Sequence, residues 1–579
     1  MIIFKNIQYN SIAQRLLSIL APALESQITL SIGFFITTCV SLFYLYIGDP
    51  RYPTEKILIP IYGLLVSLLC FVIGNILAKK FKLIYNINLA QGALIVLLSW
   101  IIACSISSSF FILAGFPMPD NNTSFSLIRK FIDGFFESMS GFTTTGTSIL
   151  PNVEIFARST LFWRSLTHWI GGMGIAYMAV TLWRGFFTRR AEIINAEAES
   201  PQIIYFKNDK DARIFGYDFL KTYGLMSLIC FSLLSISGYY FRSTPYLHFY
   251  DNIFDSLTTM FATLGTGGFM VYNSSVGLPI IENGVVVTGG LRNIVSEWII
   301  AVFMMFSAMN FGLWYIVFFQ KERIKTIFQN KELRVFISFI VITTLCIWYL
   351  LNRNFTGSVW DNFRFAFFNV TNIISTTGFA NFDFAVWPVA AQGILFSCYL
   401  IGSCVGSTGG GLKFTRYLVF FRYSIMQIKN IIHGENETTF IIDGIKYDEK
   451  SAGFILVNII VYYGLFLLGA ILIMASSSKI MFTDGTIENL DFVSGLVSSI
   501  SNLGNIGPSI VNGAVKAGPT GNYAAFSMSS KILMIFLMYL GRVGVLSFLM
   551  FFMTNQSEKE RHFRGIDIDF DSDAPFLLR

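Results

Sequence analysis

The stretch ESMSGFTTTGTSIL, residues 137–150, places glycines and small hydroxylated residues inside a chain that is otherwise very apolar. Of its 579 residues, 54% are hydrophobic and 13% are charged, and the mean hydropathy is +0.60. These values lie far outside the range of soluble globular proteins and predict a polytopic membrane protein. The fold therefore has to account for a polar patch at the depth of lipid.

Ten apolar runs are each long enough for the roughly 20 residues that cross a bilayer, so we predict ten spanning helices. The segment before the first run lacks the order of a cleaved signal and is expected to stay in the chain. The runs lie near 27–48, 57–78, 88–115, 160–187, 219–241, 290–320, 333–351, 390–421, 452–476 and 529–553.

Basic residues follow every second run and therefore predict the orientation of the chain. Because these loops are expected on the cytoplasmic side, we predict a multi-pass protein of the cytoplasmic (inner) membrane with both termini in the cytoplasm. The net charge of +6 is explained by this bias, so the lipid bilayer is an expected partner and nucleic acid is not. The basic clusters lie at 79–82, 184–213, 321–334, 413–429 and 559–564.

The patch at 137–150 has three counterparts. Each lies on the outer side after an apolar stretch too short to span, and aligning one glycine from each patch spaces these glycines between 110 and 130 residues apart. The chain therefore reads as a fourfold repeat of span, short helix, glycine patch and span. The patches are GFTTTGTSIL (141–150), TLGTGGFMVY (263–272), NIISTTGFAN (372–381) and SNLGNIGPSI (501–510), aligned on Gly146, Gly268, Gly378 and Gly507.

We therefore predict an all-α polytopic membrane protein with four span–pore-helix–span repeats around a central pore, preceded by two extra transmembrane helices. The predicted parts are the two N-terminal helices (1–87), repeat 1 (88–190), repeat 2 (214–330), repeat 3 with an intramembrane loop at 402–413 (331–430), repeat 4 (450–553) and a cytoplasmic tail (554–579).

Acidic residues recur at the expected start of each short helix. They either cap the helix and complement its dipole, which we favour, or bind an ion directly. In both cases the C-terminal ends of four short helices converge, and each carries about half a negative charge, which favours a cation. These acids are Asp133, Glu137, Asp251, Asp255, Asp361, Glu488 and Asp491.

Non-helical backbone at membrane depth is tolerated only where protein buries it or a water-filled pathway lies beside it. Four such stretches around one axis imply a pathway. Glycine lets carbonyl oxygens turn toward that axis and leaves room for an ion. A ring of neutral carbonyls suits potassium, whereas calcium or magnesium would call for carboxylates.

These features resemble the Trk/Ktr/HKT superfamily of potassium transporters, and within it the Trk/Ktr-type potassium uptake membrane subunit. The match covers about residues 88–553. The motifs that carry it are the four glycine patches, HWIGGMGI (168–175), GSTGGGLK (406–413) and GR (541–542).

The resemblance implies that one glycine of each repeat lines a selectivity filter that holds potassium through backbone oxygens. Gly146 argues for potassium, since family members that prefer sodium commonly have serine there. Gly265 and the sequence GRVGVL (541–546) leave the choice between the Trk and Ktr branches open. The implied filter residues are Thr144, Thr145, Gly146, Thr266, Gly267, Gly268, Thr376, Thr377, Gly378, Asn505, Ile506 and Gly507.

Two features are expected to limit ion flow below the filter. The sequence GSCVGSTGGGLK (402–413) interrupts an apolar run, and in the family an intramembrane gating loop lies here. Arg542 lies within another run, where a charge must face a cavity, a partner or the pore; it is either a barrier or a lock on buried carbonyls. Glu297 is a second intramembrane charge, which we interpret as a structural pair or cap with Arg292 nearby. The implied gate residues are Gly406, Gly409, Gly410, Gly411, Lys413 and Arg542.

The four histidines form no metal-binding spacing and the seven cysteines lie in apolar runs, so neither an enzyme nor a cofactor is predicted. Potassium is expected as substrate, and a symporter coupled to sodium or protons is the alternative. The resemblance further implies a homodimer and a separate cytoplasmic nucleotide-binding regulatory subunit, which would dock on the basic loops.

Overall fold

The computed structural model describes most of the chain. The expected tail at 554–579, most of the basic loop at 184–213 and Arg292 lie outside the described residues. The structure describes residues 20–49, 53, 55–80, 89–115, 127–174, 209–241, 249–276, 281–282, 285–286, 293–320, 327–354, 357–434, 437–481, 487–508 and 521–545.

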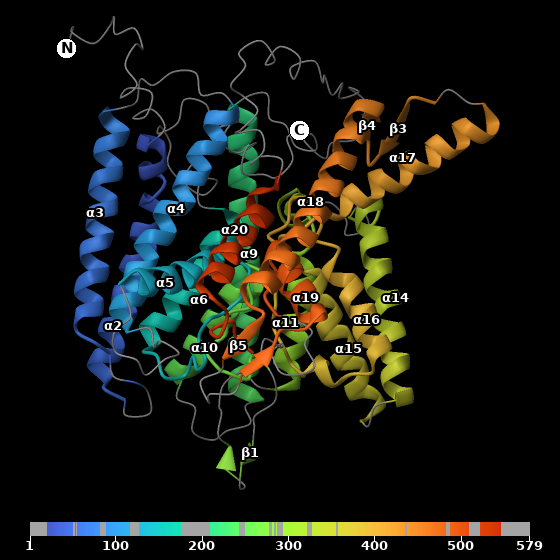
Figure 1. Cartoon of the computed structure of the whole chain (residues 1–579). Coiled ribbons are helices and arrows are strands. Elements are labelled where there is room, and N and C mark those ends of the chain that lie inside the picture. The colour runs from blue at the N-terminus through green and yellow to red at the C-terminus, as the bar shows by residue number, and fades with distance from the viewer. Residues whose placement is uncertain are drawn as a thin grey trace, which may run out of the picture.

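The described chain is mostly helical (Figure 1). Six of its helices are long and apolar enough to cross a membrane by themselves. Several such helices in one chain are typical of a multi-pass membrane protein. The six are α2 (Ile28–Ile47), α3 (Leu58–Lys80), α4 (Leu89–Ala114), α9 (Asp209–Tyr240), α14 (Lys331–Asn354) and α18 (Glu449–Ser476).

Four short amphipathic helices follow α4, α9, α14 and α18, and each packs against the long helix before it. Their C-terminal halves are almost entirely buried. The order of long helix and short helix thus recurs four times, as the glycine patches predict. The short helices are α5 (Leu127–Phe142), α10 (Phe249–Leu264), α15 (Val359–Ile374) and α19 (Phe492–Leu503).

The helix that follows each glycine patch ends or breaks part way. α6 (Arg158–Met173) ends at Gly174, where φ is 86°, and α20 (Met528–Val543) ends at Gly544, where φ is 90°. In the third repeat α16 (Val389–Tyr399) and α17 (Phe414–His433) flank the segment where the sequence predicts an interruption.

The prediction of one continuous span over 290–320 is wrong. This run forms α11 (Ile294–Ser307) and α12 (Phe311–Phe319), whose axes differ by 103°. The break occurs because the Asn310 side chain accepts a hydrogen bond from the Gly312 amide at 2.7 Å and starts a new helix. A hydropathy count does not detect such a cap.

Three antiparallel hairpins and one 3₁₀ turn, η1 (Phe384–Val386), complete the described secondary structure. The hairpin β3–β4 joins α17 to α18 and packs on both through a small apolar cluster that includes Val419, Tyr447 and Ile455. In Figure 1, α17 and this hairpin project from the helical body at the upper right. The hairpins are β1 (Ile281–Glu282) with β2 (Val285–Val286), β3 (Thr439–Ile442) with β4 (Ile445–Asp448), and β5 (Lys479–Met481) with β6 (Ile487–Asn489).

Large apolar side chains remain exposed along the outer helices, for example Leu68 on α3 and Ile460 and Ile471 on α18. An outer surface of this kind is compatible with lipid. The interior is filled by aromatic rings, among them the stacked pair Phe34 and Trp163, which ties α2 to α6. The N-terminal helix pair thus packs on the first repeat and stays outside the centre.

Candidate ion-binding site

The chain leaves each short helix through the same hydrogen bonds. After α5, the Thr145 amide donates to the Ser140 carbonyl at 2.9 Å. The equivalent bonds join Gly267 to Ala262, Thr377 to Asn372 and Ile506 to Ser501, at 2.8 to 3.0 Å. This is the pattern of a helix closed by a residue in the left-handed conformation. Four stretches with different residues therefore adopt one backbone geometry.

Positive φ values recur at matching positions in the four segments. They occur two residues before each aligned glycine and at the glycine itself. Threonine rarely adopts such angles, and backbone held this way is typical of functional sites. The values are 55° at Thr144, 52° at Thr266, 58° at Thr376 and 54° at Asn505, and then 78° at Gly146, 76° at Gly268, 86° at Gly378 and 96° at Gly507.

The four glycines form a closed ring. A Cβ atom added to Gly146 would fall on the Gly267 carbonyl oxygen, far inside the 3.0 Å that real Cβ atoms keep. In the same way, a Cβ on Gly268 would meet the Thr377 oxygen. A Cβ on Gly378 would meet the Ile506 oxygen, and one on Gly507 would return to the Thr145 oxygen. Each repeat thus places a carbonyl against the glycine of the repeat before it.

The oxygens of the ring are neutral, because they belong to backbone carbonyls, and four buried acids of the surrounding helices are paired with bases. Gly146, Gly268 and Gly378 are partly exposed, whereas the two residues before each of them are buried. The buried ion pairs are Asp133–Lys531 (2.9 Å), Glu137–Arg164 (2.7 Å), Asp255–Arg158 (3.3 Å) and Glu297–Arg364 (3.3 Å).

The acids near the short helices have several roles. Asp491 is the N-cap of α19, since it accepts from the Ser494 amide at 2.9 Å. Asp251 and Asp361 lie in first turns, as the dipole interpretation expects. Two findings correct our expectation that these acids mark helix starts. Glu488 lies in β6, and Asp133, Glu137 and Asp255 lie inside α5 and α10, where they form buried ion pairs. Glu297 forms a structural pair, with Arg364, and accepts from Asn381 Nδ2; Arg292, which we expect nearby, lies outside the described residues.

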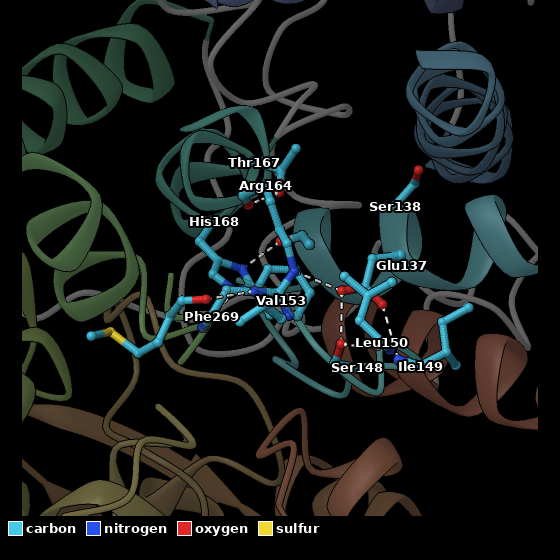
Figure 2. Close-up of polar contacts among 12 residues, drawn as sticks. Glu137, Ser138, Ser148, Ile149, Leu150, Val153, Arg164, Thr167, His168 and Phe269 are labelled. Atoms are coloured by element: carbon cyan, nitrogen blue, oxygen red, sulfur yellow. Dashed lines mark hydrogen bonds and ion pairs between the residues drawn. The ribbon is translucent and has the colours of Figure 1, made fainter. Parts of the chain in front are cut away.

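The first segment is held by an ion pair that sequence reasoning missed (Figure 2). Glu137 Oε1 accepts from Arg164 Nε at 2.7 Å and from Ser148 Oγ at 3.0 Å, and Oε2 accepts from the Ile149 amide at 3.1 Å. Ser148 and Ile149 lie two and three residues after Gly146 in the chain. In the sequence, Glu137 and Arg164 stand out only as an acid and a base among apolar residues, and this pattern does not predict that they form a pair.

Different side chains hold the other segments. The Asn372 side chain accepts from the Phe379 amide at 2.7 Å, which braces the third segment against its own helix. Asn505 Nδ2 donates to Thr145 Oγ1 at 2.9 Å, and Thr147 Oγ1 donates to Asn502 at 3.1 Å. The fourth segment is thus bonded to the first. Similar backbones with dissimilar supports give a ring that is fourfold in shape but not in side chains.

The 402–413 loop lies against the ends of the short helices. Thr408 Oγ1 donates to the Leu264 carbonyl at the end of α10, at 2.9 Å, and the Gly410 amide donates to Thr376 Oγ1 at 2.8 Å. A Cβ on Gly410 would meet the Asn505 side chain. The loop therefore contacts segments of three repeats directly.

The same loop is fastened to the break in the second repeat. The Phe311 amide donates to the Gly406 carbonyl at 2.9 Å, and the Cys404 amide donates to the Ala308 carbonyl at 3.0 Å. Within the loop, Lys413 Nζ donates to the Gly409 carbonyl at 2.5 Å. Gly411 adopts a φ of 73° close to the Gly504 carbonyl. The backbone of the bend at 308–311 is thus hydrogen-bonded directly to the loop.

Arg542 binds backbone carbonyls from two other repeats. Its Nη1 donates to the Thr408 carbonyl at 2.5 Å, and its Nη2 donates to the Gly171 and Gly172 carbonyls at 2.7 and 2.8 Å. Nη1 also lies 3.4 Å from Thr144 Oγ1. The guanidinium thus lies between the loop, the end of α6 and the first glycine segment.

Comparison with known proteins matches residues 67–562 to the TrkH family model, described as a cation transport protein. The "Trk system potassium uptake protein TrkH" of Escherichia coli strain K12 is 28% identical over 473 residues, which cover 80% of this chain and 85% of that protein. TrkG of the same strain is 29% identical over 350 residues, or 59% of this chain and 63% of that protein.

Among solved structures, the crystal structure of the potassium transporter TrkH from Vibrio parahaemolyticus has a TM-score of 0.68 to this chain. At 21% identity it covers 92% of this chain and 98% of its own, and it shows a shared fold. The family model spans well over half of the sequence and includes all four glycine segments, the 402–413 loop and Arg542. The chain therefore belongs to the TrkH family of cation transport proteins.

Proposed function

We propose that this protein takes up potassium ions through the ring of backbone oxygens formed by the four glycine segments. The observation that carries the proposal is the closed cycle in which each glycine faces a carbonyl of the next repeat. Carbonyl rings of this type replace the hydration shell of a monovalent cation. The proposed ligands are the backbone oxygens of residues 144–146, 266–268, 376–378 and 505–507.

Two further observations favour potassium. Glu137, which accepts from the Ile149 amide, and Asp133 on the same helix are both paired with basic residues, so the ring offers dipoles and not the carboxylates that divalent ions prefer. Several relatives are named as Trk system potassium uptake proteins, and so have potassium as their substrate. We extend that assignment to this chain.

We further propose that the 402–413 loop and Arg542 close the pathway on the cytoplasmic side of the ring. The loop contacts three of the short-helix ends, and Arg542 adds a positive charge beside Thr144. A fixed cation close to a narrow passage raises the barrier for another cation. Opening would require the loop to leave the Arg542 guanidinium.

The names of the relatives refer to a Trk system, which is consistent with a membrane subunit that works with other components. We propose a homodimer in the cytoplasmic membrane, with both termini in the cytoplasm. A cytoplasmic nucleotide-binding regulatory subunit would dock on the basic loops at 184–213, 321–334 and 413–450. Of these loops, residues 209–213, 327–334, 413–434 and 437–450 are described.

Rubidium and sodium flux into liposomes that contain the full chain tests this function. We expect the wild type to carry rubidium in strong preference to sodium and Gly146→Ser to lose that preference, because its side chain would meet the Gly267 carbonyl. An unaltered preference would refute the proposed site. Flux that stops without a sodium or proton gradient would assign the chain to the symporters.

A further inference from the structure

Among the buried polar side chains of α6, Arg164 and His168 lie four residues apart and therefore on one face of the helix. The helix belongs to the first repeat. Both side chains reach the backbone of the second repeat, at Met270 and Phe269 respectively. Figure 2 shows them side by side, between Glu137 on one side and Phe269 on the other.

His168 bridges two backbone groups that fix which ring nitrogen carries the proton. The Phe269 amide can only donate, so Nε2, at 3.1 Å from it, must accept. The Gly141 carbonyl can only accept, so Nδ1, at 2.8 Å, must donate. The neutral imidazole with its proton on Nδ1 therefore connects the end of α5 to the residue that follows Gly268.

The imidazole also supports the ring from behind. A Cβ on Gly267 would meet Cγ, Nδ1 and Cδ2 of His168, so the Gly267 backbone lies directly on the imidazole. On its other side, the carbonyl of Gly267 faces Gly146. Any shift of the His168 ring would therefore move the oxygen at the junction of the first and second segments.

Arg164 makes a second connection across the same junction. Its Nη1 donates to the Met270 carbonyl at 3.0 Å, and its guanidinium lies 3.5 Å above the Phe269 ring. Through Nε it holds Glu137, which in turn accepts from the Ile149 amide. One ion pair thus bonds the backbone two residues after Gly268 to the backbone three residues after Gly146.

We propose that His168 and Arg164 are positioning residues that set the spacing between the first and second glycine segments and thereby the selectivity for potassium over sodium. This inference rests on the proposed function of the ring. The two ions differ mainly in size, and binding groups must be held within about 0.5 Å to discriminate on that basis. Two rigid, buried polar groups that bond both backbones provide such a constraint.

The test compares His168→Gln and His168→Leu by rubidium and sodium flux in liposomes. A glutamine amide has both a donor and an acceptor and can restore the bridge, whereas leucine has neither. We expect His168→Leu to lower the rubidium-to-sodium flux ratio about tenfold, as the loss of one or two buried hydrogen bonds would predict. We expect His168→Gln to keep most of the ratio.

Trp169→Phe is the matched control. Trp169 is the next residue on α6, and its Nε1 donates to Ser227 Oγ on α9 at 3.0 Å. The variant loses this bond, which does not involve the glycine segments. Its flux ratio should equal that of the wild type. A general loss of α6 packing would instead lower the ratio in both Trp169→Phe and His168→Leu, and that result would overturn the proposal.

Arg164→Met provides an independent variant if His168→Leu does not fold. It removes the Met270 bond and leaves Glu137 unpaired, and we expect the same loss of selectivity with total flux retained. If the wild type prefers rubidium and Arg164→Met has the same rubidium-to-sodium flux ratio, the inference about Arg164 and His168 is wrong, but the proposed function of the ring stands. A wild type that does not discriminate between the two ions would instead remove the proposed function itself.

Discussion

The guanidinium of Arg542 donates a hydrogen bond to the carbonyl oxygen of Thr408 at 2.5 Å, and so ties α20 of the fourth repeat to the loop of the third. The other end of the guanidinium holds the Gly171 and Gly172 carbonyls of the first repeat. Arginine is thus both a lock on buried carbonyls and a charge beside the ring. The two interpretations of this residue describe one arrangement.

Arg542→Ala should therefore increase ion flow. It removes the charge near Thr144 and releases the loop at Thr408, and a barrier lowered by about 1.4 kcal/mol raises a rate tenfold. We expect rubidium flux in liposomes to rise by about that factor. Arg422→Ala, an exposed arginine on α17, is the control and should leave flux unchanged. Equal flux in Arg542→Ala and wild type would exclude Arg542 from the barrier.

Glu332, at the start of α14, should hold the same loop from the other side. It is buried and accepts from the Val405 amide at 3.1 Å and from Thr415 Oγ1 at 2.5 Å. Glu332→Ala would leave these donors unpaired at a cost of about 1–3 kcal/mol. We expect raised basal flux together with a lower unfolding temperature in detergent.

Glu437→Ala is the control for that prediction, because Glu437 is an exposed acid that precedes β3. It should change neither basal flux nor the unfolding temperature. If Glu332→Ala lowered stability without any effect on flux, Glu332 would be a structural residue only, with no influence on the loop.

The sequence predicted the part of the fold that repeats. Gly146, Gly268, Gly378 and Gly507 stand out because the surrounding residues are apolar, and their spacing shows four copies of one unit. A single patch carries little information, whereas four in matching places predict one backbone geometry. The positive φ values at all four glycines fit that expectation.

The supports of the ring could not be predicted, because they depend on contacts between distant parts of the chain. Lys531 pairs with Asp133 across 398 positions, and His168 bonds to Phe269 across 101. Periodicity places a side chain on a helix face but does not say which helix it meets. The bend at Asn310 was missed for another reason, since one capping side chain outweighed a long apolar run.

Asp443 should stabilise the start of α14 from the β3–β4 hairpin. Its carboxylate accepts from the Lys331 amide at 2.6 Å and from the Glu332 amide at 3.1 Å, which satisfies two free amides of the helix end. Asp443→Ala should lower the free energy of unfolding by about 1 kcal/mol, as for other lost helix caps. Asp443→Asn retains one acceptor and tolerates the positive φ of 48°, so it should lose less. Thermal unfolding in detergent measures both, and equal losses would contradict a capping role.

Gly541 should be irreplaceable for packing. A Cβ there would fall on the Leu503 carbonyl at the end of α19, and Gly171 on α6 has the same relation to the Phe142 carbonyl at the end of α5. The Leu503 carbonyl cannot move away from an added Cβ without shifting the glycine segment that follows α19. Gly541→Ala should therefore lower both the unfolding temperature and the yield of monodisperse protein. Gly464→Ala on α18 is the matched control, because beyond the adjacent residues and backbone of α18 itself, no atom lies within 4 Å of its added Cβ. It should be neutral or stabilise the helix by about 0.5–1 kcal/mol, and a Gly541→Ala protein as stable as this control would show that α20 does not pack closely on α19.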